Sequence, residues 1–242
     1  TYNSGGVRFC ALQHVCLTIE EGAFVAVKGP SGSGKTTLLN ILGTLDSPDS
    51  GSYLFRGREV GTLKPKEKNR FRRDTLGFVF QNFNLIPELT VFENIEIPLL
   101  IVKERNRKER VLAAAEAVGL TRHLKHRPAQ LSGGQQQRVA IARTLAPKPQ
   151  VIFMDEPLSN LDAKLRLEMR SELQRLHLDM GSTFIYITHD QLEAMTLSSK
   201  ICLMDNGIIH QYQTPLAMYE KPANLFAADF LGNPSINFVE AL

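Results

Sequence analysis

One glycine-rich segment constrains the fold more than any other part of the sequence. Residues 29–36 read Gly-Pro-Ser-Gly-Ser-Gly-Lys-Thr and fit the pattern GxxxxGK[ST]. They follow an apolar run at 24–27 and precede a stretch whose apolar residues at 38–42 share one helical face. A strand, a glycine-rich turn and a helix start in this order predict a phosphate-binding loop, whereas an ordinary Gly/Ser turn is the alternative.

The chemistry of this loop suits a nucleotide polyphosphate. Glycines let several backbone N–H groups point at one anion, and the helix start adds the positive end of its dipole. The Lys35 ammonium can lie between the β- and γ-phosphates, and the Thr36 hydroxyl can ligate Mg²⁺. The candidate nucleotide-binding residues of the loop are Gly29, Pro30, Ser31, Gly32, Ser33, Gly34, Lys35, Thr36 and Thr37.

Two carboxylates follow another apolar run. Residues 151–154 lead into Asp155 and Glu156, at the strand end where open α/β sheets present their ligand sites. Asp155 is placed to hold Mg²⁺, and Glu156 is placed to orient and deprotonate an attacking water. An Asp-Glu pair alone is as well explained by a helix cap or a solvated turn, but the phosphate loop upstream favours the catalytic interpretation.

The wider pattern predicts an α/β fold. Four short apolar runs, at 24–27, 151–154, 184–187 and 201–204, indicate buried strands of a largely parallel sheet. A stripe from Leu165 through Met169, Leu173 and Leu176 to Met180 predicts a helix packed on that sheet. Residues 82–147 contain no such run and predict a helical insertion, and the last thirty residues predict short helices and turns over the surface.

Composition narrows the function classes. The formal charge is only +3 over 242 residues, and the basic runs at 70–73 and 103–110 have no interleaved aromatics, which favours solvated helix faces over nucleic-acid binding. Cys10, Cys16 and Cys202 have neither CxxC spacing nor a partner histidine, so neither zinc nor a disulfide framework is expected. No apolar run reaches roughly 18 residues, so a membrane role requires a partner. Because the chain opens on Thr1, we expect further residues upstream.

A second helix start carries a family resemblance. Residues 131–135 read Leu-Ser-Gly-Gly-Gln and resemble the signature of the ABC ATPase family. One γ-phosphate does not need two anion cradles from one small domain, unless the second belongs to another copy. In the family, the signature of one subunit closes over the ATP held by its partner. The resemblance therefore implies an ATP-dependent homodimer, with residues acting in trans: Ser132, Gly133, Gly134, Gln135 and Asp162.

Other family elements occur in the expected order. Gln81 matches the Q-loop glutamine that senses Mg²⁺ and water, and residues 158–162 match the D-loop at the dimer interface. His189, after the strand at 184–187, matches the switch histidine that contacts the γ-phosphate. Tyr2 matches the aromatic residue that stacks on adenine. The resemblance thus implies catalysis by Glu156, His189 and Lys35, and Mg²⁺ ligation by Thr36, Gln81 and Asp155.

The resemblance also implies an architecture and a setting. We expect one nucleotide-binding domain with a phosphate-loop (RecA-like) core, an antiparallel β part near the N-terminus and an inserted helical subdomain. The core would comprise residues 1–85 and 148–221, the helical subdomain 86–147 and a C-terminal tail 222–242. ATP hydrolysis would drive an integral membrane permease, with the chain held at the cytoplasmic face of the membrane and residues 82–101 lining the permease contact. No nucleic acid and no direct membrane insertion are expected.

The two halves resemble different branches of the family. The first half, to about residue 134, resembles the lipoprotein-release and macrolide-efflux branch, as at residues 77–87. The second half, from about residue 143, resembles the sugar-importer branch, as at residues 155–162, 188–196 and 232–238. A natural intermediate, a recombinant and an engineered chimera all remain open. In the importer branch a regulatory β-domain usually follows at the point where this sequence ends.

Two other functions compete with transport. Non-transport ABC ATPases of DNA repair or translation typically carry a coiled-coil or zinc insertion, or two ATPase domains, and no such feature occurs in this sequence. A nucleotide-binding module without turnover would predict the loss of Glu156 or His189, and both residues are present. The transported molecule, and import against export, stay open.

Overall fold

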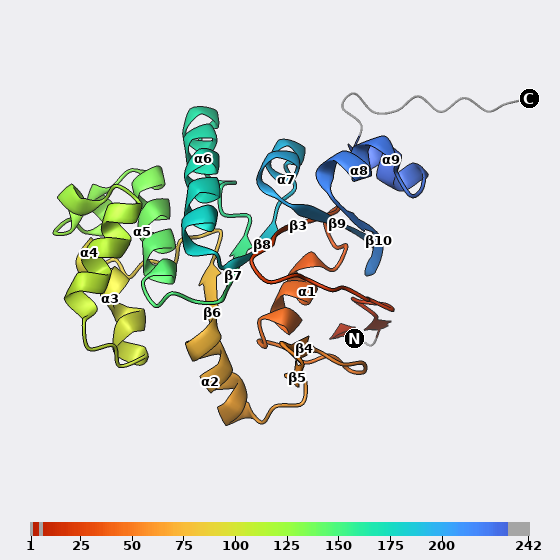
Figure 1. Cartoon of the computed structure of the whole chain (residues 1–242), viewed down its shortest axis with the longest axis horizontal. Coiled ribbons are helices and arrows are strands. Elements are labelled where there is room, and N and C mark those ends of the chain that lie inside the picture. Colours follow the sequence, from red (N-terminus) through yellow and green to blue (C-terminus); the bar gives the residue numbers. More distant parts are fainter. Residues whose placement is uncertain (1, 5–6, 232–242) are drawn as a thin grey trace, which may run out of the picture.

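A six-stranded sheet lies at the centre of the computed structural model, which describes residues 2–4 and 7–231 (Figure 1). The strand order is β10-β9-β3-β8-β7-β6, and β10 is antiparallel to its neighbour β9 while the other pairs are parallel. The strands are β3 (Phe24–Lys28), β6 (Leu76–Val79), β7 (Val151–Asp155), β8 (Thr183–Ile187), β9 (Lys200–Asp205) and β10 (Ile208–Gln213). The expected mainly parallel α/β sheet is confirmed.

The sheet is wider than the four apolar runs predicted. β6 interrupts its apolar residues with Gly77, and β10 mixes Ile208 and Ile209 with polar side chains. Both lie at the edges of the sheet, where neighbouring strands cover one side only. A continuous apolar run predicts a strand that is covered on both faces, and neither β6 nor β10 contains such a run.

Alternate residues of the central strands face two separate layers. On β3, Val25 and Val27 pack with Leu38 and Leu39 of α1 (Lys35–Leu42), while Phe24 faces the opposite layer. That opposite layer includes α6 (Ala163–Met180), whose Met169, Leu173 and Leu176 are buried as the stripe predicted. The alternation of side chains along the strands and the helical spacing of apolar residues therefore place a layer of helices on each face of the sheet.

The segment from 82 to 147 contains helices and no strand, as predicted. It forms α3 (Val91–Ile101), α4 (Arg107–Ala117) and α5 (Gly133–Leu145), with short 3₁₀ turns η1 (Thr121–His123) and η2 (Pro128–Gln130). Ile95, Leu99, Val111 and Ala115 are fully buried between these helices and belong to the same core cluster as Phe24. The helical part is thus packed continuously with one face of the sheet.

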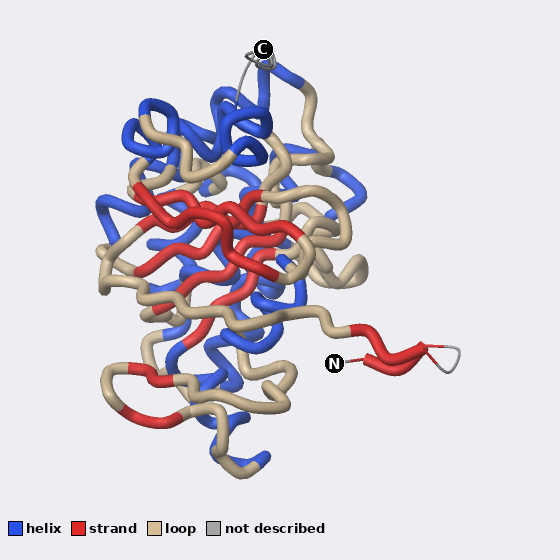
Figure 2. The backbone as a smooth tube through the Cα atoms, turned by 90° about the vertical axis from the view of Figure 1, so that its right-hand side faces the viewer, coloured by secondary structure: helices blue, strands red, loops and turns tan. Residues whose placement is uncertain are grey.

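The remaining elements lie around this body. The antiparallel strands β1 (Tyr2–Ser4) and β2 (Val7–Phe9) project away from the sheet (Figure 2). A second small antiparallel pair, β4 (Leu54–Phe55) with β5 (Arg58–Glu59), precedes α2 (Pro65–Thr75). Beside β9 and β10 lie α7 (Gln191–Leu197), α8 (Pro215–Glu220) and α9 (Leu225–Leu231). The expected antiparallel part near the N-terminus is therefore present, whereas residues 232–238, used for the branch resemblance, lie outside the described part of the chain.

The helices α8 and α9 are packed more firmly than surface turns would be. Met218 of α8 and Ala227 of α9 are fully buried beside Ala26 of β3 and Ile201 of β9. The proposed boundary between core and tail at residue 222 therefore falls between two helices that share one small core.

Candidate functional site

The carboxyl ends of the parallel strands form one edge, and most of the predicted site residues follow those ends. Val79 of β6 pairs with Met154 of β7, and Asp155 pairs with Ile187 of β8. In β3, Val27 pairs with the same Ile187. The register therefore places four parts of the chain at the same edge of the sheet. They are the phosphate loop, Gln81, the Asp155–Glu156 pair and His189.

The phosphate loop has the backbone that the sequence predicted. Gly34, which precedes α1, has φ of 98°, and no side chain caps the first turn of the helix. A Cβ atom on Gly29 would lie 2.1 Å from the Met204 carbonyl oxygen, so only glycine allows the loop to lie this close to β9. An uncapped helix start leaves backbone N–H groups for an anion, and the loop therefore fits a phosphate chain.

Lys35 lies over the same loop. Its ammonium donates to the carbonyl oxygens of Gly29 at 2.9 Å and Pro30 at 2.8 Å. Partial burial lowers the pKa of Lys35, while the charges of Glu156 and Asp155 act in the opposite direction. A half-buried ammonium beside two carboxylates is stabilised by further negative charge, which a polyphosphate would supply.

The acidic pair stands at the end of β7. Burial raises the pKa of Asp155, and the neighbouring Glu156 charge raises it further, while Lys35 lowers it. A divalent cation at this point would favour the ionised Asp155, so the carboxylate suits Mg²⁺ on chemical grounds. The other proposed Mg²⁺ ligands, Thr36 and Gln81, have exposed side chains at the same edge of the sheet.

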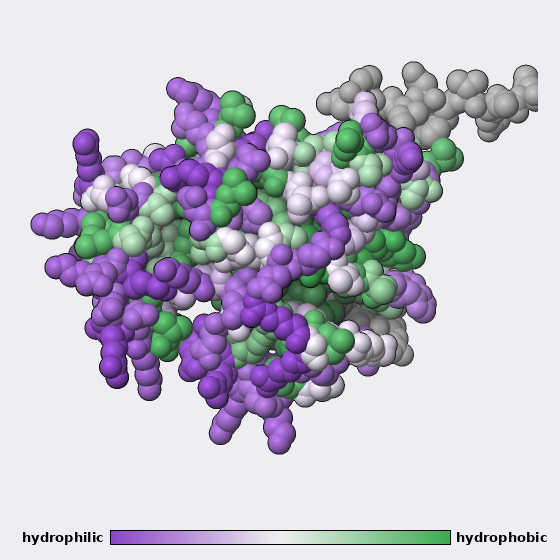
Figure 3. Space-filling view, viewed as in Figure 1, coloured by the Kyte–Doolittle hydropathy of each residue, from purple (hydrophilic) through white to green (hydrophobic). Residues whose placement is uncertain are grey.

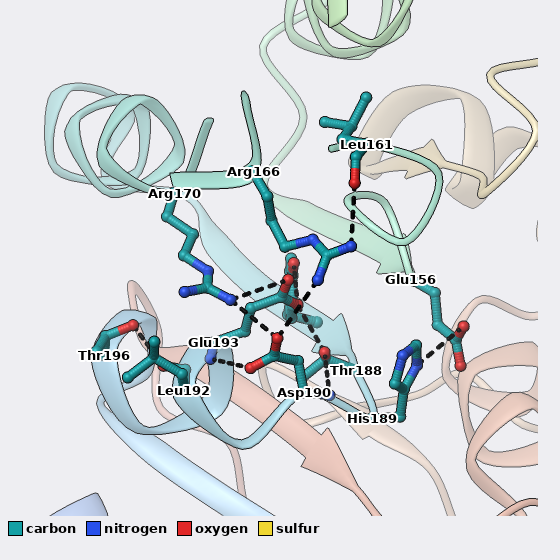
Figure 4. A network of polar contacts seen from close by, with 11 residues as sticks. Glu156, Leu161, Arg166, Arg170, Thr188, His189, Asp190, Leu192, Glu193 and Thr196 are labelled. Carbon is teal, nitrogen blue, oxygen red and sulfur yellow. Dashed lines mark hydrogen bonds and ion pairs between the residues drawn. The ribbon is translucent and has the colours of Figure 1, made fainter. Parts of the chain in front are cut away.

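His189 and Glu156 are brought together. The imidazole Nδ1 lies 3.3 Å from Glu156 Oε2, and the two side chains are 65% and 27% exposed (Figure 4). The Glu156 backbone N–H donates to the Ile187 carbonyl at 3.0 Å, which fixes the carboxylate beside the loop of β8. A carboxylate and an imidazole in contact at an open edge have the geometry of a proton-accepting pair.

The segment 158–162 contacts two other parts of the edge. Asn160 Nδ2 donates to the Gln81 carbonyl at 3.1 Å. The Asp162 side chain caps α6 by accepting from the Leu165 backbone N–H at 2.9 Å. Asn160 and Asp162 are exposed next to Glu156 and His189, whereas Leu158 and Leu161 of the same segment are buried.

The second predicted anion site differs from the first. Ser132 caps α5 in a capping box, in which its Oγ accepts from Gln135 N and Gln135 Oε1 accepts from Ser132 N. Gly133 is exposed, but Gly134 is buried, and a Cβ atom there would lie 2.3 Å from a Leu165 methyl group. Gly134 therefore allows α5 to pack against α6.

α1 and α5 pack on opposite faces of the sheet. Leu38 and Leu39 of α1 lie in one core cluster, and Val139 and Ile141 of α5 lie in the other. The helix that starts after Ser132 and the helix that follows the phosphate loop therefore pack on different faces of the sheet. The Tyr2 backbone is in β1, but its side chain lies outside the described part of the structure.

Sequence reasoning missed a charged cluster beside His189. Arg166 and Arg170 of α6 meet Asp190 and Glu193 at the start of α7 (Figure 4). The spacing of four residues between the two arginines puts them on one helical face, which was the available signal. Their carboxylate partners could not be identified from the sequence, because they meet the arginines only when α6 packs against α7.

No helix in the described part of the chain is long and apolar enough to cross a membrane.

The comparisons of this chain with known proteins agree with one another. The model of the ABC transporter family matches residues 12–159. The osmoprotective compounds uptake ATP-binding protein GgtA of Synechocystis is 44% identical over 235 residues, which is 96% of this chain and 63% of that protein.

Other relatives are similar to the same extent. The trehalose/maltose import ATP-binding protein MalK of Thermococcus litoralis is 42% identical over 240 residues, covering 96% of this chain and 63% of the relative. The maltose/maltodextrin import protein MalK of Yersinia pestis is 47% identical over 225 residues, covering 92% and 59%. The chain thus spans about three fifths of the length of these curated relatives.

A solved structure has the same fold. The dimeric ATP-binding cassette MJ0796, in a post-hydrolysis state bound to ADP and Pi, superposes with a TM-score of 0.79 at 42% identity. The match covers 88% of this chain and 94% of that one.

Proposed function

The chain belongs to the ABC transporter family. We propose that it binds ATP at residues 29–37 and hydrolyses it to ADP and phosphate. One observation carries the proposal: the Glu156–His189 contact of 3.3 Å lies at the sheet edge where the phosphate loop begins. In this assignment Lys35 neutralises the β- and γ-phosphates, and Glu156 orients the attacking water and accepts its proton. His189 contacts the γ-phosphate.

Mg²⁺ fits the same edge. Thr36, Gln81 and Asp155 would hold it, and the ion would neutralise charge on the phosphate oxygens. The raised pKa of Asp155, caused first by burial, supports a cation there.

We also propose a homodimer, in which the start of α5 at Ser132 completes the site of a second copy. The opposite placement of α1 and α5 supports this arrangement. The dimeric state named for the MJ0796 cassette is a further support.

Import is the direction that the relatives favour. The proteins GgtA and MalK are named for uptake or import, so the efflux direction suggested by the first half of the sequence is not supported. We propose that the chain drives uptake of a small solute, of the carbohydrate or osmoprotectant class, through a membrane permease that holds it at the membrane surface. The non-transport alternatives of DNA repair and translation are not favoured by these relatives.

ATP hydrolysis is tested by Lys35→Ala. Loss of the ammonium leaves the β- and γ-phosphate charge poorly neutralised, and the expected loss of turnover is on the order of 10³-fold. Phosphate release and binding of a fluorescent ATP analogue measure the effect, with the exposed Lys108→Ala as control. Turnover close to that of the unchanged protein in Lys35→Ala would refute the assignment of this loop.

A further inference from the structure

A polar network lies directly behind His189 (Figure 4). Glu193 is 4% exposed, and its Oε2 accepts from the hydroxyls of Tyr186 at 2.9 Å and Thr188 at 2.6 Å. Asp190 Oδ2 lies 3.0 Å from an Arg170 guanidinium nitrogen, which is also 3.6 Å from Glu193 Oε1. Every carboxylate of this network therefore has a cationic or hydroxyl partner, as buried charges require.

The network fixes the backbone on both sides of His189. The Thr188 backbone N–H donates to the Val27 carbonyl at 3.3 Å, and the Asp190 N–H donates to Thr188 Oγ1 at 3.0 Å. Asp190 Oδ1 then accepts from the Glu193 N–H at 3.1 Å and caps α7. Because the His189 side chain is largely exposed, its flanking residues set where the imidazole stands relative to Glu156.

Arg166 joins this network to a second segment. One guanidinium nitrogen donates to the Leu161 carbonyl at 3.0 Å, and the other lies 3.8 Å from Asp190 Oδ2. The lining of one small cavity of about 10 Å³ includes Arg166, Asp190, Glu156 and His189. The guanidinium thus bridges residues 158–162 to the loop that carries the imidazole.

We propose that Arg166 is a positioning residue that links the segment 158–162 to His189. Movement of Leu161 shifts the guanidinium, and the guanidinium shifts Asp190 and the imidazole next to it. The arrangement makes the Glu156–His189 contact depend on the position of segment 158–162. This inference rests on the proposed ATPase function and adds a residue that acts through His189 without touching the nucleotide.

Arg170 lets this role be separated from folding. It is only 11% exposed and pairs with both Asp190 and Glu193, so these carboxylates keep a partner when Arg166 is replaced. Arg166 itself is 31% exposed. The Arg166→Met protein is therefore expected to fold, and its thermal unfolding is expected to stay close to that of the unchanged protein.

The first test compares Arg166→Met with Lys164→Met. Lys164 is exposed on the same first turn of α6, so both variants lose one positive charge from that turn. Arg166→Met is expected to lower kcat about tenfold with KM for ATP changed less than twofold, because the nucleotide contacts stay while the imidazole is misplaced. Lys164→Met should change neither. Arg166→Lys keeps the charge but cannot bridge both partners, and it should restore less than half of the activity.

The second test does not depend on turnover. In NMR spectra of protein with ¹³C-labelled histidine, the His189 ring signal is identified by its absence from His189→Ala. That signal should move in Arg166→Met and stay unchanged in Lys164→Met. An unmoved signal together with an unchanged kcat overturns the inference, as does a kcat loss that Lys164→Met reproduces. If the unchanged protein does not hydrolyse ATP, the proposed function fails, and the ring signal still decides the role of Arg166.

Discussion

At the scale of single residues, Glu156 has an unusual backbone. Its φ is 44°, a left-handed conformation that is uncommon for residues other than glycine, asparagine and aspartate. Hydrogen bonds hold it there, because its carbonyl accepts from the Ser159 N–H at 3.3 Å and from Ser159 Oγ at 2.9 Å. Strained conformations persist where surrounding contacts over-determine them, and they concentrate at functional sites. The backbone therefore supports the catalytic role proposed for Glu156.

Lys28, the last residue of β3, is a buried cation. It is 3% exposed, and burial lowers its pKa from 10.5 to about 8, while the charge of Asp190 acts in the opposite direction. Between those two pH values the unfolded chain binds more protons at this side chain than the folded chain does. The contribution of Lys28 to the free energy of unfolding therefore rises from about pH 8 to 10.5.

Lys28→Met is expected to raise the free energy of unfolding at pH 7, by up to about 3 kcal/mol, because a charged group no longer has to be buried. The gain over the unchanged protein should shrink as the pH rises from 7 to 9.5. Urea denaturation at both pH values measures it, and Lys164→Met should show no such trend. A variant that is less stable at pH 7, or whose gain does not change with pH, contradicts this expectation.

The positions of candidate site residues could be predicted from the sequence where a short motif contains them. Asp155 and Glu156 lie at the end of β7, and Lys35 opens the helix that follows the phosphate loop, so pattern and position were both visible. Arg166 could not be found in this way, because its partner Asp190 meets it only after α6 and α7 have packed.

At the scale of elements, two helix starts differ in how their N–H groups are satisfied. α1 begins after Gly34 without a side-chain cap, whereas α5 begins after Ser132 with a complete capping box. An anion approaching α5 would therefore meet a helix start whose N3 N–H group is already bonded. In the proposed dimer, this helix start and the uncapped start of α1 belong to different subunits.

The two helix starts predict an ATP-dependent dimer. Glu156→Gln keeps the shape of the side chain and removes the base, so ATP should stay intact and hold two subunits together. The unchanged protein, which turns ATP over, should run mainly as a monomer. Size-exclusion chromatography with light scattering, with and without ATP, measures both.

The interface is tested by a further substitution in the Glu156→Gln protein. Ser132→Arg places bulk and charge at the start of α5 and should prevent the dimer. Ser171→Arg, at an exposed serine of α6, is the matched control and should leave it intact. The shared-site arrangement is contradicted if the Glu156→Gln protein stays monomeric with ATP bound. It is also contradicted if the dimer still forms after Ser132→Arg is added.

Strands were predicted correctly from the sequence where both of their faces are buried. β3, β7, β8 and β9 followed from continuous apolar runs, since both faces of these strands are covered. β6 and β10 were missed because Gly77 interrupts the apolar residues of the first and polar side chains are mixed with those of the second. The helical nature of residues 82–147 was predicted, while the boundaries between helical subdomain and core stay a prediction.

At the scale of the whole molecule, one part of the surface is a candidate contact with the proposed permease. Residues 82–101 were expected to line it, and the segment divides between core and surface. Ile95 and Leu99 are fully buried, whereas Ile86, Leu100 and Ile101 are 40%, 51% and 59% exposed. On the face shown in Figure 3, apolar side chains form separate small patches among polar ones.

The buried Asn94 shapes this part of the surface. Its side chain accepts from the Ile86 N–H at 2.8 Å and donates to the carbonyl oxygens of Ile86, Leu89 and Thr90 at 3.0 to 3.1 Å. The loop that presents Ile86 is thus held in one conformation before α3, which suits a docking surface.

Capture of a membrane subunit tests the partner. The tagged full-length protein, extracted in detergent from its own cells, should carry an integral membrane protein with it. Ile86→Glu and Leu100→Glu should lower the recovery about tenfold, because each puts a charge into an apolar contact. Leu178→Glu, at a 75% exposed leucine of α6, should leave recovery unchanged. Absence of any membrane protein, or equal loss in all three variants, contradicts the proposed partner.

The strand order has a consequence for how the protein is made. β3 leads into the phosphate loop, yet its neighbours in the sheet, β8 and β9, come from residues 183–205. The turn after β9 also supports the loop, since Gly207 N–H donates to the Ser33 carbonyl at 3.1 Å. Long-range pairing of this kind is completed late in folding, and the ribosome releases the N-terminal part first. The phosphate loop is therefore synthesised before the strands that flank β3, and it gains their support only after residues 183–207 have been made.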